Sequence, residues 1–345
     1  MTDSVSDEDF GWDFIGIAQF YQGQGLYELA EVWYQKGLTA TQTQLGELHP
    51  DVVLNLIKLA EFYRIQHRYE DAELFYVKAL HLNEQVFGQD HAAIASCMNQ
   101  LAELYVEWER YEEAEWLYVK ALELNKRLFG DAHLAVASSL NNLSGVYAKL
   151  RRYDDAELFC LQALQLNRQL LGETHPNVMR SLNNVVALYS QQGRYEDAES
   201  LLWETVDRRK AQLGESHPCV FSCLDGLVAL YGEQERYADV EWLLKKLLLL
   251  RKERLGVSHP DVALTLNNLA YFYYRQREYR WSKPLYMAAL ALSQIILGTN
   301  HPQTATIRAN LALLLEQMGS HAMSAIQFPE IQDIWNYVEQ TIWFD

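Results

Sequence analysis

Seven histidines recur along the chain at a constant interval of 42 residues, and they are the first candidates for metal ligation. They are His49, His91, His133, His175, His217, His259 and His301. Several ligands must converge to within about 2 Å of one zinc ion. Residues that recur at a fixed long interval lie one structural repeat apart, which prevents this convergence. We therefore expect the histidines to be structural, and we expect no metal and no other cofactor.

The other reactive side chains form no catalytic pattern. The four cysteines, Cys97, Cys160, Cys219 and Cys223, match no metal-ligand spacing, and we interpret them as small core residues. Cys97 and Cys223 occupy a repeat position that other repeats fill with Ser139, Ser181 and Thr265. Acidic runs such as 70–73 recur in most repeats, which is typical of a solvated face. Because no Ser-His-Asp or Cys-His combination stands out, the sequence predicts no enzyme.

Carboxamide side chains recur eight and nine residues after the histidines. The first position holds Asn99, Asn141, Asn183 and Asn267, and the second holds Gln100, Asn142, Asn184, Asn268 and Asn310. A carboxamide both donates and accepts hydrogen bonds, so it can pair with the N–H and C=O groups of any peptide backbone. Each bond contributes about 0.5–1.5 kcal/mol net, so several are needed for useful affinity. Alternatively, one carboxamide of each pair binds a neighbouring helix or loop.

The sixth repeat interrupts this pattern with Asp225 and Gly226. Glycine inside a helix costs about 1 kcal/mol relative to alanine. The missing side chain either leaves space for a bulky residue of a partner or reflects sequence drift.

Pairs of amphipathic helices are the elements that must position these residues. In the fifth repeat, apolar residues at 178, 182, 185, 186 and 189 have helical spacing, and a second helical pattern runs from Tyr195 to Leu213. The motif Leu171 to Pro176 separates the repeats, because its glycine can end one helix and its proline can begin the next. A constant interval of this kind indicates one supersecondary unit stacked on copies of itself.

Two other repeat positions hold tyrosine, and we interpret both as core. One holds Tyr27, Tyr69, Tyr111, Tyr153, Tyr195, Tyr237 and Tyr279, and the other holds Tyr63, Tyr105, Tyr147, Tyr189, Tyr231 and Tyr273. A small residue, such as Ala72 or Ala198, follows three residues after the first position and allows two helices to approach closely.

The pattern predicts an all-α fold of about eight antiparallel helix pairs. The repeats lie near 10–48, 49–90, 91–132, 133–174, 175–216, 217–258, 259–300 and 301–326. We expect residues 1–9 to be a disordered acidic N-terminus and residues 327–345 to form a capping helix, or alternatively a detachable ligand of the protein's own groove. Apolar residues with helical spacing support that helix: Ile331, Ile334, Trp335, Val338, Ile342 and Trp343.

Composition limits the classes of partner. A formal net charge of −17 repels a phosphate backbone, so nucleic acid is not an expected partner. The longest apolar stretches are far shorter than the ~18–20 residues that span a bilayer, so no membrane partner is expected either. The acidic N-terminus has no basic leader, and we expect a cytoplasmic protein.

The helix pairs resemble the tetratricopeptide repeat, and their 42-residue form closely resembles the repeats of kinesin light chains and their bacterial relatives. The resemblance rests on Leu-Gly-x-x-His-Pro, followed in the seventh repeat by Asp261-Val262-Ala263 and Leu266-Asn267-Asn268-Leu269-Ala270, and on Arg-Tyr-x-x-Ala-Glu. It covers residues 10–326 and implies a right-handed superhelical solenoid. The heptad segment that joins those light chains to a motor would precede the repeats, where only nine residues stand here, so the resemblance indicates a free-standing scaffold.

The resemblance also implies that the first helix of each pair faces a concave groove. The carboxamides then become candidates for peptide binding. Further candidates are Lys58, Glu61, Glu103, Arg180 and Arg275. Kinesin light chain grooves favour peptides with tryptophan beside acidic residues, but Glu61 and Glu103 would oppose an acidic ligand.

The sequence therefore predicts a non-enzymatic scaffold that binds peptide segments or protein surfaces in this groove. The alternative is a structural subunit of a stable assembly that associates through its end caps or its convex face. We expect a monomer or a weak homo-oligomer.

Overall fold

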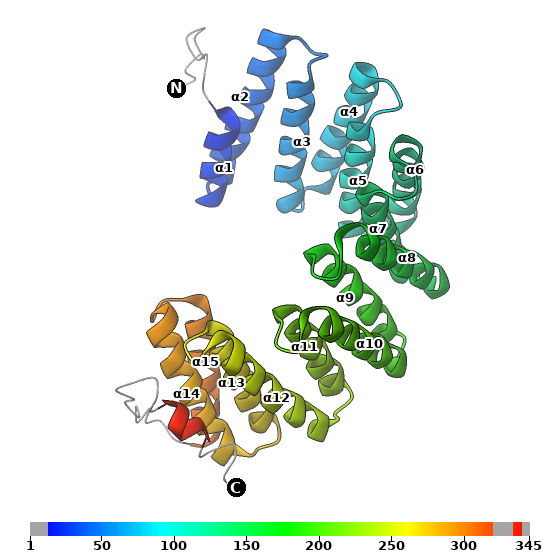
Figure 1. The fold of residues 1–345 in the computed structure, drawn as a ribbon. Coiled ribbons are helices and arrows are strands. Elements are labelled where there is room, and N and C mark those ends of the chain that lie inside the picture. The colour runs from blue at the N-terminus through cyan, green and yellow to red at the C-terminus, as the bar shows by residue number, and fades with distance from the viewer. Residues whose placement is uncertain (1–12, 320–333, 340–345) are drawn as a thin grey trace. The chain divides into compact units, whose positions relative to one another are not determined.

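The computed structural model describes residues 13–319 and 334–339, and this part of the chain consists of helices joined by short turns (Figure 1). The longer helices are α1 (Phe14–Gly23), α2 (Tyr27–Leu45), α3 (Pro50–Ile65), α4 (Tyr69–Phe87), α5 (Ala92–Glu107), α6 (Tyr111–Phe129), α7 (Leu134–Lys149), α8 (Tyr153–Leu171), α9 (Pro176–Gln191), α10 (Tyr195–Leu213), α11 (Pro218–Glu233), α12 (Tyr237–Leu255), α13 (Pro260–Arg275), α14 (Tyr279–Leu297) and α15 (Pro302–Gln317). Odd- and even-numbered helices form consecutive hairpins, so the predicted all-α solenoid of helix pairs is confirmed.

The chain divides into two compact units between Leu188 and Tyr189, inside α9. The first unit contains α1 to α8 and most of α9. The second contains the last turn of α9, α10 to α15 and the segment 334–339. Within each unit, helices contact their neighbours along the chain, as expected when each repeat packs only on the next.

The repeat histidines begin the odd-numbered helices. From α3 to α15, the imidazole Nδ1 of the histidine accepts a hydrogen bond from the backbone N–H two residues further on, at 3.1–3.2 Å. This bond satisfies one of the amides that lack a partner in the first turn of a helix. The structural role predicted for these histidines is confirmed.

Glycine ends the even-numbered helices in a conformation that other residues avoid. Gly130, for example, has φ 78° and ψ 174° at the end of α6. A positive φ combined with an extended ψ is open essentially only to glycine. The turns inside the hairpins differ, because non-glycine residues such as His67 and Glu109 adopt φ values near 60° there. The glycine of the repeat motif is therefore required between repeats, whereas the turn within a repeat accepts other residues.

Small residues and tyrosines fill the core between the helices. Ala72, Ala114 and Ala156 have no exposed surface, which allows the close helix approach predicted for this position. The tyrosines near the ends of the odd-numbered helices are buried in α3, α5, α7 and α11. At the other tyrosine position the core interpretation is wrong for Tyr27 and Tyr237, which are 47% and 41% exposed.

Buried polar side chains join each repeat to the next. Asn125 donates to Ser139 Oγ at 3.0 Å, and Asn167 donates to Ser181 Oγ at 2.9 Å. In the second unit the longer side chain of Arg251 stands at the repeat position of these asparagines, and it donates to Thr265 Oγ1 at 2.7 Å. Cysteine also occupies the acceptor position. All four cysteines are free thiols; Cys97, Cys160 and Cys223 are buried and Cys219 is half-buried, so the core interpretation holds for the first three.

Residues 334–339 form a short helix in the second unit, and Ile334, Trp335 and Val338 are buried. The Lys252 ammonium lies 4.6 Å from the centre of the Trp335 ring and forms an ion pair with Glu339. The contacts of this helix thus reach α12. Residues 1–9 and the apolar residues Ile331, Ile342 and Trp343 lie outside the described part of the chain.

Candidate interaction surface

A cavity of about 450 Å³ opens between α1, α2 and α3 in the first unit. Its lining residues are Gln19, Gln22, Gly23, Tyr27, Tyr34, Lys58, Glu61, Phe62 and Ile65. Tyr34 and Phe62 are buried, whereas Ile65 is 54% exposed. The cavity therefore combines buried aromatic side chains with an apolar residue that remains accessible. Concave sites of this size, with apolar walls and a few polar groups, are typical of ligand sites.

Polar groups of the cavity are fixed by contacts with one another. The Lys58 ammonium lies 2.8 Å from Glu61 Oε2, and the Tyr34 hydroxyl donates to Gln22 Oε1 at 2.9 Å. Burial and, secondarily, the negative charge of Glu61 raise the pKa of Tyr34, so this phenol remains a neutral donor. The structure thus brings together two residues expected from the sequence, Lys58 and Glu61.

Sequence reasoning missed the other wall of the cavity. Ile65 follows Lys58 by seven residues, so helical spacing alone places both on one face of α3. Gln19 and Gln22 lie in the first repeat, which precedes the first histidine marker, so counting from the markers did not reach them.

At the first carboxamide position, the side chains of Asn141 and Asn267 form hydrogen bonds with neighbouring repeats. The Asn141 amide donates to Ser181 Oγ at 3.0 Å, and its oxygen accepts from Asn184 at 3.4 Å. In the second unit, the Asn267 oxygen accepts from Asn310 at 3.0 Å. Asn141 and Asn267 are buried. These bonds match the alternative in which one carboxamide of each pair binds a neighbouring helix.

The second carboxamide position is half-buried, and its members have unequal partners. Gln100 donates to Glu61 Oε1 at 3.4 Å, and Asn268 Oδ1 accepts from Asn267. Within residues 13–319 and 334–339, the Asn142 side chain makes no hydrogen bond and retains its full capacity for a ligand. Of the other candidates, Asn99 lies on α5, Asn183 and Arg180 lie on α9, and the Arg275 guanidinium donates to the Tyr271 hydroxyl.

The interruption in the sixth repeat has a structural cause inside the molecule. The Asp225 carboxylate forms an ion pair with the buried guanidinium of Arg251. A Cβ atom at Gly226 would lie 3.3 Å from Leu202 Cδ2. Leu202 of α10 therefore occupies the space beside Gly226, which argues against the alternative of a pocket for a bulky residue of a partner.

Carboxylates gather on the odd-numbered helices next to the cavity. Glu61 lies on α3, and Glu103 and Glu107 lie on α5. Burial raises the pKa of the Glu103 carboxyl, Arg64 lowers it, and the charges of Glu107 and Glu61 raise it further. Arg64 forms an ion pair with Glu107, while Glu103 has no ion-pair partner in the described chain. This part of the surface favours a cationic group over an acidic one.

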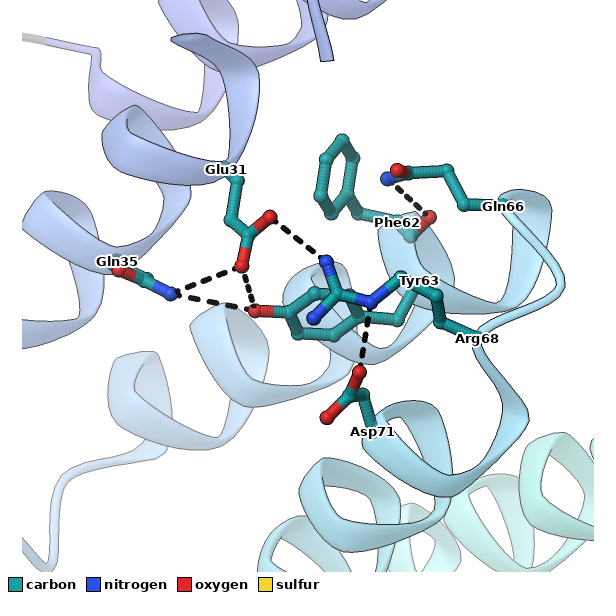
Figure 2. A network of polar contacts seen from close by, with 7 residues as sticks. All are labelled: Glu31, Gln35, Phe62, Tyr63, Gln66, Arg68 and Asp71. Carbon is teal, nitrogen blue, oxygen red and sulfur yellow. Dashed lines mark hydrogen bonds and ion pairs between the residues drawn. The ribbon is translucent and has the colours of Figure 1, made fainter. Parts of the chain in front are cut away.

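The structure also contains a polar contact between repeats that the sequence did not predict. Figure 2 shows this contact for the first two repeats, where the Tyr63 hydroxyl donates to Glu31 at 2.7 Å. The Arg68 guanidinium binds both Glu31 and Asp71. It also lies 4.3 Å from the centre of the Tyr63 ring. Burial, followed by the bond to Glu31, raises the pKa of Tyr63 to about 12. We call this arrangement the Arg–Tyr–Glu latch.

The latch recurs with Arg110, Tyr105 and Glu73, and again with Arg236, Tyr231 and Glu199. The glutamate of the latch ends an acidic run for which the sequence predicts a solvated face. For Glu73 and Glu199 this prediction is wrong, because both are half-buried and paired with arginine. The arginine that precedes α4, α6, α8, α10 and α12 was the available signal.

The helix hairpins and these contacts between repeats define an α-solenoid protein. Models of the tetratricopeptide repeat match residues 14–80, 52–127, 109–159, 135–211, 220–261 and 261–328. The chain belongs to the tetratricopeptide repeat family.

Solved structures of similar fold include repeats of the kinesin light chain type. BtubC (BKLC) from P. vanneervenii is 22% identical, with a TM-score of 0.54, and the match covers 67% of this chain and 92% of that chain. A putative kinesin light chain from Podospora anserina is 18% identical, with a TM-score of 0.51, over 59% and 97% of the two chains. No curated protein matches the sequence. In the part of the chain that the structure describes, no helix is long and apolar enough to span a bilayer.

Proposed function

We propose that the protein is a non-enzymatic scaffold that binds a segment of another protein along the exposed faces of its odd-numbered helices, with one side chain of that segment seated in the cavity between α1, α2 and α3. The cavity is the observation that carries this proposal. It lies on the helix face that the sequence marked for peptide contact, and its lining includes Lys58 and Glu61.

The chemistry of the surface supports an anchored, extended ligand. Tyr34, Phe62 and Ile65 provide apolar contact for one inserted side chain. Further along the same face, the Asn142 carboxamide can both donate to and accept from a peptide backbone. Glu103 adds a carboxylate that favours a basic residue in the bound segment.

Selection of binders from a random peptide display library tests the anchoring site. Ile65→Asp places a charge at the edge of the cavity, and peptides enriched on the wild-type protein should bind this variant at least about tenfold more weakly. Ile295→Asp is a matched control, because Ile295 on α14 is 52% exposed and is not one of the residues that line the cavity. The proposal fails if both variants lose binding to the same extent, or if neither variant loses it.

Two adjacent asparagines test the contribution of the carboxamides. Asn142→Ala should weaken binding of the selected peptides with little change in melting temperature. Asn141→Ala should lower the stability by about 1–3 kcal/mol, because it leaves buried partners without their hydrogen bonds. If Asn142→Ala melts early and binds normally once folded, its carboxamide is structural and this part of the proposal fails.

A further inference from the structure

A cation near the end of the even-numbered helices pairs, in three successive repeats, with an acid five residues further along the chain. The ion pairs are Lys126 with Asp131 at 3.4 Å, Arg168 with Glu173 at 3.1 Å and Lys210 with Glu215 at 3.2 Å. Each pair links the last turn of an even-numbered helix to the turn that leads into the next repeat. The charge of the cation is therefore paired locally in these repeats.

Lys252 stands at the same repeat position on α12, but it lacks the local acid. The residue five positions further on is Val257, which carries no charge. The Lys252 ammonium instead forms an ion pair with Glu339, 87 residues away in the sequence, and it lies 4.6 Å from the centre of the Trp335 ring. The missing acid leaves the charge of Lys252 available to a segment that is distant in the sequence.

The segment 334–339 presents two different groups to this one lysine. Trp335 and Glu339 are four residues apart, so they lie on the same face of the helix. Ile334, Trp335 and Val338 are buried, whereas Asn336 is exposed. The segment is therefore an amphipathic helix whose aromatic residue and acidic residue both contact Lys252. We call the surface of the second unit that residues 334–339 cover the Lys252 site.

The contacts of this segment are those of a ligand that can be replaced. The side chains of Lys252 and Glu339 are 30% and 44% exposed, and ion pairs with this much exposure stabilise a structure only weakly. The Trp335 side chain is buried, yet its indole N–H has no hydrogen-bond partner among the described residues. Burial of an unpaired donor costs free energy. A segment that has phenylalanine there, or that places an acceptor beside the indole, avoids this cost.

We propose that the Lys252 site binds a helical segment of a partner protein that carries an aromatic residue and, one turn later, an acidic residue. Residues 334–339 occupy the site until such a segment replaces them. The aromatic ring covers the Lys252 ammonium, and the carboxylate pairs with it. The site belongs to an even-numbered helix of the second unit, so it is separate from the cavity between α1, α2 and α3 and does not depend on the function proposed for that cavity.

A fluorescent peptide with the sequence of residues 331–342 stands in for the partner segment, and fluorescence anisotropy reports its binding to the full-length protein. In the wild type the attached segment competes at an effective concentration of about 1 mM, so the peptide should bind weakly. Trp335→Ala weakens this competitor, and the peptide should bind that variant at least about tenfold more tightly, because a buried tryptophan carries much of the energy of a contact. Equal binding to both proteins, or no binding to Trp335→Ala, would overturn the proposal.

Charge reversal tests the role of the lysine. Lys252→Glu, added to Trp335→Ala, should weaken binding at least about tenfold, and a peptide with Glu339→Lys should recover it. Lys126→Glu is the matched control, because Lys126 holds the same repeat position in the first unit, and it should leave binding unchanged. The idea is wrong if the two reversals weaken binding equally, or if the reversed peptide fails to bind the Lys252→Glu protein.

A second variant decides the question if Trp335→Ala disturbs the fold of the second unit. Glu339→Lys retains the buried tryptophan and breaks only the partly exposed ion pair. Its melting temperature should stay close to that of the wild type, while the affinity for the peptide should rise at least about twofold. An unchanged affinity in this variant would mean that the segment is a fixed part of the core, and the proposal would fail.

Two further measurements distinguish other sites and occupants. Ile65→Asp should leave binding of this peptide intact, and its loss in that variant would place the peptide in the cavity and refute the Lys252 site. Sedimentation of the wild type should show no dimer that depends on Lys252. A dimer abolished by Lys252→Glu would make the segment of a second copy the occupant and also overturn the proposal. Failure of the peptide selection on the cavity would leave this test unaffected, since the two sites have separate variants.

Discussion

At the scale of single residues, asparagines adjacent in sequence take different environments. Asn141 is buried and bonded to α9, whereas the next residue, Asn142, keeps its carboxamide accessible. The rotation of about 100° between successive residues of a helix separates them, so Asn141 bonds to the following repeat, whereas Asn142 is half-buried and makes no hydrogen bond within the described chain. Asp225 and Gly226 replace such a pair, and both substitutions are accounted for by internal partners, Arg251 and Leu202.

Replacement of two glycines by alanine should change the stability of the protein in opposite directions, because the backbone conformations of the glycines differ. Gly130 has a positive φ with extended ψ, so Gly130→Ala should destabilise the protein by about 1–3 kcal/mol. Gly145 lies inside α7 with open space around its Cα, so Gly145→Ala should stabilise the protein by about 0.5–1 kcal/mol. Thermal denaturation of both variants checks the opposite signs. A stabilising alanine at residue 130 would show that the turn between repeats does not require glycine.

The raised pKa of Glu103 makes a prediction about pH. Because the folded state penalises the charged carboxyl, the group holds its proton more tightly in the folded than in the unfolded chain. Its unfavourable contribution is complete above the raised pKa of the folded state and disappears as pH falls below 4.5, the ordinary pKa of a glutamate side chain. Glu103→Gln should therefore be more stable than wild type at neutral pH, with a difference that shrinks towards zero in acid. Denaturation curves at several pH values measure it, and a difference that grows in acid would contradict the pKa shift.

At the scale of helices, the sequence predicted boundaries better than it predicted contacts. Histidine and glycine sit at the chain positions where helices begin and end, so local chemistry sufficed. The Arg–Tyr–Glu latch joins residues of two helices and the turn after the second helix. Glu31 on α2, Tyr63 on α3 and Arg68 just before α4 are brought together only in the packed structure (Figure 2). The cavity escaped prediction for the same reason, since α1, α2 and α3 each supply part of its wall.

The seventh repeat lacks the arginine of the latch. Glu278 stands at that position, and Glu241 binds Lys245 at 2.8 Å while it still accepts from Tyr273. The charge of Glu278 also contributes to the raised pKa of Tyr273, after burial and the effects of Glu241. This interface carries an extra negative charge where the preceding repeat carries Arg236.

Restoring the latch should stabilise the second unit. Glu278→Arg supplies a guanidinium that can cover the Tyr273 ring and pair with Glu241, a gain of about 1 kcal/mol for one partly exposed ion pair and one cation–π contact. Arg236→Gln removes the equivalent group one repeat earlier and should cost a similar amount. Chemical denaturation measures both, and the idea fails if Glu278→Arg leaves stability unchanged while Arg236→Gln lowers it.

At the scale of the whole molecule, stability is a sum over neighbouring repeats. The latch and the buried bonds such as Asn125 to Ser139 connect adjacent repeats, so distant substitutions share no partners. Arg110→Gln and Arg236→Gln, one in each unit, should have additive effects within about 0.5 kcal/mol. Arg110→Gln and Tyr105→Phe act on one latch and should not be additive. Double-mutant cycles compare the two pairs, and strong coupling between the distant arginines would show that repeats communicate beyond their neighbours.

The buried bonds between repeats also determine how the chain can change length. Removal of residues 133–174 would bring Asn125 opposite Ser181, which is the same pairing of asparagine with serine that each residue has now. Insertion of a copy of those 42 residues would likewise repeat existing partners. The sixth repeat is different, because Arg251 requires both Asp225 and Thr265. The chain can therefore lose or duplicate the repeat 133–174 while keeping the bond between asparagine and serine. Around α11 to α13, in contrast, neighbouring repeats are fitted to each other and cannot be exchanged without burying an unpaired charge.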